Sequence, residues 1–443
     1  GARARMATMS RAVSMTMMAL AGRFLLLASA ADSGDEVCAL QAARRTSDRS
    51  ASAHEALLAD SSNVHIIFTV DCNPYNLWQA ELLFFSAQRV GQRGPITQIV
   101  SGCASKEREE SIKQRHATLG LPEQHMLHFV EKFNDDESHV INKPLGVAAW
   151  FREVGTDRDI VACVDPDFVF VRPLTPTMDG ADEAIGWTGP EPKPTRIQKG
   201  VVGGQRWLTF IWPTESQAPF LPTMDAAFQN MTPDELQTWI CSGSTTGPSG
   251  CTGVTKEEVS YYHGSGPPML AHREDWEEWL VDAWSETTKR LHQVYKKYYV
   301  DMLSYTLANI HHRKRQLIVN NLELTKPGLF EPWDAVKKAV EDVDPCTAPM
   351  DQVLSRPDLA YFVHYTHYMQ GWNKRWFNGR GVKHLFERCD ATEDDSELRQ
   401  FLDTSADSSN RTEAFTPCVM RRFFAAGLRR SCAGRPAAAA VEK

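Results

Sequence analysis

Two carboxylates one residue apart, Asp165 and Asp167, follow a short and wholly apolar run at 160–164. Such a run is typical of a strand covered on both faces, and open α/β sheets bind ligands at the carboxyl ends of their strands. With Pro166 restraining the backbone between them, the two side chains can direct oxygens at one Mg²⁺ or Mn²⁺ ion that also binds phosphates. Asp and Pro are also common turn residues, so the tripeptide alone equally allows a plain turn.

A histidine in the last strand-like run of the sequence is a candidate third ligand of the metal ion. His364 lies in the run 361–367, which is strand-like and also contains His367. A single histidine in such a run is more often a hydrogen-bonded core residue. Together with Asp165 and Asp167, however, His364 could supply the imidazole of an Asp/Asp/His manganese site.

Candidate phosphate-binding residues lie before Asp165 and after His364 in the chain. Asn142 and Lys143 open a predicted helix at 145–153 that leads into the central strand, and exposed N–H groups with a lysine at a helix start favour a phosphate. On local evidence alone, an ordinary capped helix with a solvated lysine is the preferred interpretation. Lys374, beyond the last strand-like run, is a further candidate cation for the phosphates.

One acid interrupts the apolar face of a helical pattern over 274–310. Asp301 has Tyr298 and Tyr305 as its neighbours at i−3 and i+4. A carboxylate in that position is either paired structurally or directed into a cleft. We therefore take Asp301 as the candidate general base.

The elements that would position these residues begin with a strand at 64–70. Asn73 and Pro74 then start a helix that Gly91 would terminate, and a second strand (96–100) and helix (105–119) follow. This alternation indicates a parallel, doubly wound start. Thr69 and Asp71 consequently lie at the carboxyl end of the first strand, where a nucleotide base or ribose would bind.

Composition excludes several classes of protein. The 443 residues are 42% hydrophobic and 23% charged, which is typical of a globular protein with a sizeable core. A net charge of −8 argues against nucleic-acid binding through overall basicity. The ten cysteines are too sparse for a small disulfide scaffold, and no Cys-x-x-Cys pair suggests zinc.

The N-terminal region predicts entry into the secretory pathway. Residues 1–31 are expected to be a signal peptide, or a signal anchor that holds a type II protein in the membrane, and 32–60 a stem. The sequons at Asn230 and Asn410 agree with a location in the ER or Golgi lumen, where Cys241 and Cys251 would pair. We expect one catalytic domain at 61–390, with a loop-rich insertion near 190–260, and a low-order tail at 391–443.

With these pieces in order, the chain resembles the plant and algal hydroxyproline O-arabinosyltransferases and peptidyl-serine α-galactosyltransferases. The resemblance extends over roughly 62–380, and four segments in the same order carry it: 68–79, 141–147, 164–173 and 363–366.

The resemblance implies a GT-A-type fold, a Rossmann-like mixed sheet flanked by helices. In that fold an Asp-x-Asp motif binds Mn²⁺ and the diphosphate of a UDP-sugar. It assigns Asp165 and Asp167 to the motif and His364 to the third metal ligand, with Asn142 and Lys143 lining the donor pocket. The implied acceptor is a hydroxyl of a hydroxyproline- or serine-rich protein.

Donor and stereochemistry stay open at this point. Asp-Pro-Asp falls between the Glu-Pro-Asp of the arabinosyltransferases and the Asp-Ala-Asp of the galactosyltransferases. We slightly prefer an arabinosyltransferase-like enzyme over a peptidyl-serine α-galactosyltransferase. A secreted carbohydrate-binding protein without turnover is the alternative from another class.

Overall fold

A computed structural model describes the following parts of the chain: 55–133, 139–178, 195–206, 231–243, 249–251, 254, 263–295, 299–325, 333–354, 356, 358–365 and 410–433. The predicted leader and most of the predicted stem lie outside these residues. All elements named below belong to the compact unit Leu58–Lys443.

Four parallel strands form the first half of a seven-stranded sheet. Pairing runs from β3 through β2 and β1 to β4, in parallel register throughout. The strands are β1 (Val64–Asp71), β2 (Ile96–Ser101), β3 (His125–Val130) and β4 (Ile160–Val164). The predicted doubly wound start is confirmed, although the sequence analysis did not predict β3, whose outward side chains are partly exposed.

The second half of the sheet makes it mixed. Strand β7 (Ser265–His272) is antiparallel to both β4 and β6 (Val201–Arg206), and β8 (Arg315–Val319) is parallel to β6. The order is therefore β3-β2-β1-β4-β7-β6-β8. The predicted α/β class, a mixed sheet flanked by helices, is confirmed.

Strand β6 lies inside the segment 190–260 that we expected to be a loop-rich insertion, so this part belongs to the main sheet. Its two glycines explain why it was difficult to recognise. A side chain at Gly203 would place Cβ 2.4 Å from Ile197 Cδ1, and one at Gly204 would place it 2.8 Å from Ser265 Cβ. The strand therefore has glycines, which have low strand propensity, at positions where a larger side chain would clash with Ile197 or Ser265.

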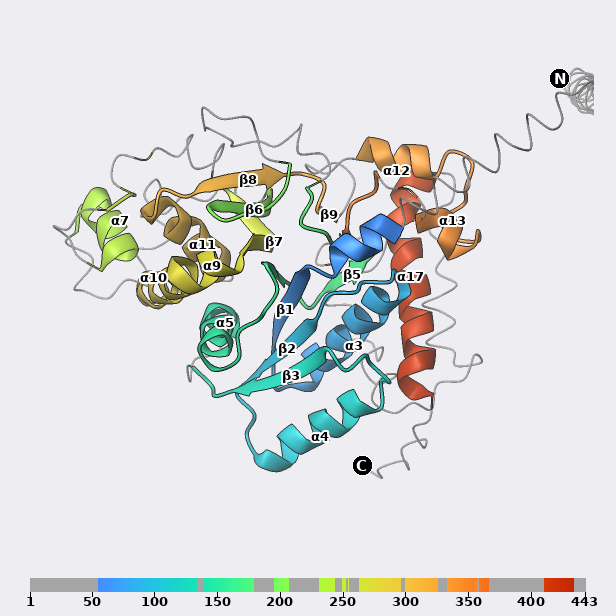
Figure 1. Cartoon of the computed structure of the whole chain (residues 1–443), viewed down its shortest axis with the longest axis horizontal. Helices are drawn as coiled ribbons and strands as arrows, with labels where there is room; N and C mark the ends of the chain where they lie inside the picture. The colour runs from blue at the N-terminus through green and yellow to red at the C-terminus, as the bar shows by residue number, and fades with distance from the viewer. Residues whose placement is uncertain are drawn as a thin grey trace, which may run out of the picture. The chain divides into compact units, whose positions relative to one another are not determined.

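Helices cover both faces of this sheet (Figure 1). Neighbouring residues of β1 belong to different cores: Ile67 packs in the core with α5 (Asn142–Glu153), and Ile66 in the core with α3 (Pro74–Arg89). Asn73 caps α3 as predicted, and the helix ends two residues before Gly91. Helix α4 (Lys106–Ala117) begins after its cap, Ser105.

The helical pattern predicted over 274–310 is several elements rather than one helix. These are α9 (Arg273–Asp275), the π-helical turn η5 (Trp276–Leu280), α10 (Val281–Val294) and α11 (Val300–His311). Helices α10 and α11 are held side by side because Trp284 Nε1 donates a hydrogen bond to the Asp301 carbonyl at 2.7 Å. The predicted Cys241–Cys251 disulfide, at the end of α7 (Pro233–Ser242), is confirmed.

A second sheet of three short strands lies beyond β4. Strand β10 (Phe362–His364) is in the centre, antiparallel to β5 (Phe168–Phe170) and parallel to β9 (Glu323–Leu324). The predicted strand around His364 is therefore confirmed over three residues. This small sheet joins the segment after Asp167 to two segments from the C-terminal half of the chain.

Part of the expected low-order tail is a long helix, α17 (Arg411–Cys432), which packs along α3 (Figure 1). Its apolar residues, including Phe415, Val419 and Phe423, are buried in a core shared with α12 (Trp333–Ala339) and α13 (Met350–Leu354). A disulfide joins Cys418 to Cys346. We did not predict this helix because the serine-rich residues before it, and Pro417 within it, obscure the apolar period.

Among the described residues, no helix is both long and apolar enough to cross a membrane. The predicted signal peptide or anchor lies outside those residues and stays a prediction.

We expect the Cys346–Cys418 disulfide to stabilise the fold more than the Cys241–Cys251 disulfide does. The first closes a separation of 72 residues and the second one of 10, and loss of loop-closure entropy in the unfolded chain grows with loop length. The Cys346→Ala/Cys418→Ala variant should lose about 2–4 kcal/mol of unfolding free energy in urea titrations. An equal or larger loss in Cys241→Ala/Cys251→Ala would contradict this ordering.

Candidate functional site

The candidate site forms where β4 ends and the small sheet begins. Asp165 follows the last residue of β4, and Phe168 N donates a hydrogen bond to the Asp165 carbonyl at 3.3 Å, which closes the turn. In the antiparallel pairing of β5 with β10, His364 lies opposite Phe168. Tyr365 N also donates to the Asp167 carbonyl at 3.3 Å. Backbone pairing therefore brings His364 beside Asp167 from a distance of almost two hundred residues along the chain.

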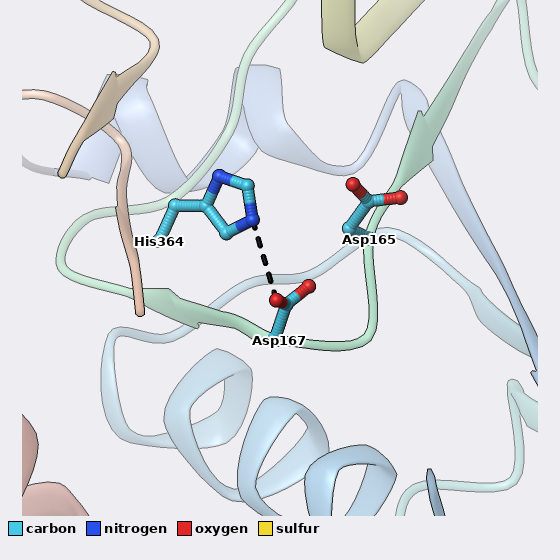
Figure 2. A group of neighbouring side chains, drawn as sticks. All are labelled: Asp165, Asp167 and His364. Atoms are coloured by element: carbon cyan, nitrogen blue, oxygen red, sulfur yellow. Dashed lines mark ion pairs between the residues drawn. The ribbon is translucent and has the colours of Figure 1, made fainter. Parts of the chain in front are cut away.

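The three predicted metal ligands lie around one small space (Figure 2). One ligand atom from each of Asp165, Asp167 and His364 lies within 4.8 Å of the others, and His364 Nε2 is 3.4 Å from Asp167 Oδ2. Asp167 and His364 are buried, whereas Asp165 is partly exposed. Two carboxylates and one imidazole suit Mn²⁺, and carboxylate oxygens suit Mg²⁺. The donor set therefore fits a divalent cation, with Asp165 on its open side.

A cavity of about 230 Å³ lies next to these ligands. It brings together most of the polar residues predicted from the sequence. The residues predicted for the site that line this cavity are Thr69, Asp71, Asn142, Lys143, Asp165, Asp167 and Asp301. Lys374 lies outside the described residues.

Lys143 is the cation at the centre of this cluster. Its Nζ lies 2.5 Å from Asp165 Oδ1 and 2.7 Å from Asp301 Oδ2. Burial would lower the pKa of Lys143, but the two carboxylates raise it well above its usual value, so the side chain stays an ammonium. The locally preferred interpretation, a solvated lysine on a capped helix, is wrong: the side chain is buried and no side chain caps α5.

Asp301 fulfils both alternatives that its position allowed. It lines the cavity and is also paired, through Lys143. Burial raises the pKa of Asp301, and the nearby ammonium of Lys143 opposes that rise. The carboxylate is therefore a stronger base than one on the surface.

The start of α5 and the end of β1 bring an amide and an acid together at the cavity. Asn142 Nδ2 donates a hydrogen bond to Asp71 Oδ1 at 2.8 Å, which fixes the orientation of the amide. Asn142 Oδ1 is buried and has no hydrogen-bond partner in the part of the chain that the structure describes. Because a buried acceptor costs free energy unless it is satisfied, this oxygen is suited to an N–H or O–H of a ligand.

Sequence reasoning missed Glu323, which lies behind His364. His364 Nδ1 is 2.8 Å from Glu323 Oε2, and the glutamate side chain is 1% exposed. Burial would lower the pKa of His364, but Glu323 and Asp167 raise it to about 10. Glu323 belongs to a two-residue strand with no periodic pattern, so only its spatial neighbours identify it.

A disulfide next to the site was also missed. Cys72, directly after Asp71, is joined to Cys103, which follows β2. The bond links the loops that leave neighbouring strands at the edge where the cavity lies. Two cysteines separated by a strand and a helix carry no local pattern that would have paired them.

The solved structures that resemble this chain include glycosyltransferases. A galactosyltransferase, LgtC, in complex with donor and acceptor sugar analogues matches 71% of this chain and 94% of its own at 14% identity and a TM-score of 0.35. The apo structure of the bifunctional glycosyltransferase WbbM matches 69% of this chain and 46% of its own, at 12% identity and a TM-score of 0.32.

Sequence similarity to particular proteins is local. A peptidyl serine α-galactosyltransferase of Chlamydomonas reinhardtii is 30% identical over 126 residues, 28% of this chain and 16% of that protein. The peptidyl serine α-galactosyltransferase of Arabidopsis thaliana is 29% identical over 135 residues, 29% of this chain and 16% of that protein. The chain thus matches a small part of the length of these relatives. No protein-family model matches it. The resemblance to the peptidyl-serine α-galactosyltransferases is confirmed over the aligned stretch.

We expect Lys143 to be needed for stability because it compensates buried carboxylates. Lys143→Met should lower the unfolding free energy by about 3 kcal/mol, since it leaves the buried charge of Asp301 unpaired. Adding Asp301→Leu should restore a large part of that loss, as chemical denaturation of the double-mutant cycle would measure.

Lys199 offers a matched control, because it also bridges two carboxylates, Glu274 and Glu278, but lies on the surface. Lys199→Met should have a much smaller effect. If the Lys199 and Lys143 variants lost equal stability, the argument from burial would be wrong.

Proposed function

We propose that this chain is a metal-dependent glycosyltransferase that moves a sugar from a UDP-sugar to a hydroxyl of a secretory-pathway protein. One observation carries the proposal. Asp165, Asp167 and His364 come together next to a cavity whose lining includes a buried ammonium, that of Lys143. That combination suits a doubly charged diphosphate beside a divalent cation.

The proposed metal ligands are Asp165, Asp167 and His364. When bound, Mn²⁺ or Mg²⁺ would supply Lewis-acid stabilisation of the negative charge on the departing diphosphate. Lys143 adds a fixed positive charge at the same place, and its two carboxylate partners hold the ammonium in position without further reorganisation. We propose the same contribution for Lys374.

The nucleoside is proposed to bind at the end of β1. Thr69 and Asp71 are at that strand end and line the cavity. The buried acceptor Asn142 Oδ1 would accept a hydrogen bond from an N–H of uracil or a hydroxyl of ribose.

Asp301 is the proposed catalytic base for an inverting transfer. It lines the cavity, and burial raises its pKa, so it accepts a proton from an acceptor hydroxyl more readily than a surface carboxylate does. Its pairing with Lys143 gives it a second role in either stereochemistry, since it holds the ammonium beside Asp165.

The curated relatives favour a different donor sugar from the one that the sequence slightly favoured. The sequence slightly favoured an arabinosyltransferase, whereas both curated relatives are peptidyl serine α-galactosyltransferases. We therefore propose UDP-galactose with a serine acceptor as the first pair to test, and an arabinosyl donor with hydroxyproline as the second.

A location in the ER or Golgi lumen is proposed from the cysteines. The disulfides Cys72–Cys103, Cys241–Cys251 and Cys346–Cys418 suit an oxidising compartment. Membrane attachment through residues 1–31 is part of the same proposal.

We expect Asp165→Asn and Asp167→Asn to abolish Mn²⁺-dependent hydrolysis and transfer of UDP-sugars while leaving the fold intact. The amides keep the shape of the side chains but remove the charge that binds the cation. Activity would be measured over a panel of UDP-sugars with serine- and hydroxyproline-containing peptides. Asp275→Asn, a buried aspartate away from the cavity, is the control.

Full activity of either variant in Mn²⁺ would show that the metal assignment is wrong. If wild-type protein binds UDP-sugars without any turnover across the panel, the non-catalytic binding protein becomes the better description.

We also expect a glycan on Asn410 when the chain is expressed through the secretory pathway. Asn410 is exposed, and it caps α17 through Oδ1, which accepts from Glu413 N at 3.3 Å. The nitrogen that carries an N-linked glycan, Nδ2, is not used in that cap. Thr412→Ala should therefore remove one glycan and Thr412→Ser should retain it, as mass spectrometry with and without glycosidase would show. An unchanged mass in Thr412→Ala would count against this site.

A further inference from the structure

We propose that Glu323 is a positioning residue that orients His364 toward the metal site and tunes its affinity for a divalent cation. This inference rests on the proposed function, because it concerns the same site. Glu323 lies in none of the sequence motifs from which the site was predicted.

The geometry places Glu323 and Asp167 at the two ring nitrogens of one imidazole. Glu323 Oε2 is 2.8 Å from Nδ1, and Asp167 Oδ2 is 3.4 Å from Nε2. A cation that bound at Nε2 would replace the proton on that nitrogen, while Nδ1, which faces Glu323, would keep its own proton. Glu323 therefore selects the tautomer that can bind a cation there.

Glu323 is not itself a ligand of the same ion. The atoms that lie within 4.8 Å of one another come from Asp165, Asp167 and His364. Glu323 contacts the opposite nitrogen of the ring, so the imidazole lies between its carboxylate and the proposed ion. This is the arrangement of a carboxylate–histidine–metal relay, in which the outer carboxylate raises the basicity of the ligand and fixes its orientation.

The surroundings hold both partners rigidly. Gln205 Oε1 accepts hydrogen bonds from the backbone N–H of Leu322 at 3.0 Å and of Glu323 at 3.3 Å. Strand β9 pairs with β10, and the His364 ring packs edge-on against Phe168, with 4.5 Å between ring centroids. The carboxylate and the ring therefore have little freedom to separate, and the pair is aligned before any ligand arrives.

The test is a titration of Mn²⁺ into the full chain with saturating UDP, followed by electron paramagnetic resonance or calorimetry. We expect Glu323→Ala to raise the Kd for Mn²⁺ by about 10–100-fold, because the ring loses both its partner and the nearby negative charge. Glu323→Gln should have a smaller effect, because its amide oxygen still accepts from Nδ1–H. Partial rescue by glutamine would separate orientation from charge.

Glu81→Gln is the matched control. Glu81 is also a buried glutamate, 4% exposed, but it pairs with Arg115 away from the cavity. It should leave the Kd for Mn²⁺ unchanged. Metal-free binding of UDP and the thermal unfolding midpoint, measured for each variant, would show whether a change in Kd reflects general loss of structure.

The possible failures are distinguishable. If wild-type protein shows no Mn²⁺ binding with UDP, the proposed function itself fails. If wild type binds Mn²⁺ and both Glu323 variants bind it equally well, the positioning role is overturned while the proposed function stands. If Glu323→Ala does not fold, Glu323→Gln decides the question, and an unchanged Kd for Mn²⁺ in that variant would overturn the inference.

Discussion

The arrangement of this site depends on the compensation of negative charge at the edge of a buried sheet. Asp165 and Asp301 come from different elements and would repel each other in a region from which water is largely excluded. Lys143 offsets that repulsion because its ammonium contacts both carboxylates. A buried ammonium and a buried carboxylate are each costly alone, so the three side chains must be brought together as a unit. The ion pairs of Lys143 with Asp165 and Asp301 hold the first turn of α5 beside the end of β4 and the start of α11.

A second constraint concerns how the histidine reaches the site. His364 is separated from Asp167 by most of the C-terminal half of the chain, and side-chain attraction alone would not fix its position. The three-stranded sheet does so with backbone hydrogen bonds, since pairing of β10 with β5 sets the register and pairing with β9 adds Glu323. The Lys143 ion pairs and the β10 pairings therefore have different functions. The ion pairs neutralise the charge of the carboxylates, and the backbone pairings fix the distances between Asp167, His364 and Glu323.

These constraints explain how much could be predicted from the sequence. The elements around β1, α3 and β4 were predictable because their apolar periods and the cap at Asn73 are local. Asp165, Asp167 and His364 were grouped from their residue types as a possible metal site, family resemblance assigned the same roles, and the structure brings the three together. The environment of Lys143 was not predictable locally, because its partners are 22 and 158 residues away in the chain. Glu323 and the Cys72–Cys103 pair were missed for the same reason. The long-range pairings of β6 and α17 likewise depend on packing partners that no local period indicates.

The residues of the site differ in exposure, which separates a buried group from an open side at Asp165. Asp167, His364 and Glu323 are buried and held by the small sheet, whereas Asp165 is partly exposed and faces the cavity. Under the proposed function this buried group would have to be rigid, because Mg²⁺ demands near-ideal octahedral geometry of its ligands. Recognition of a particular sugar and acceptor needs contacts on the open side, beyond Asp165. Under the proposed function, the Asp-Pro-Asp segment would hold the diphosphate, and the choice of sugar would depend on residues on the open side of Asp165.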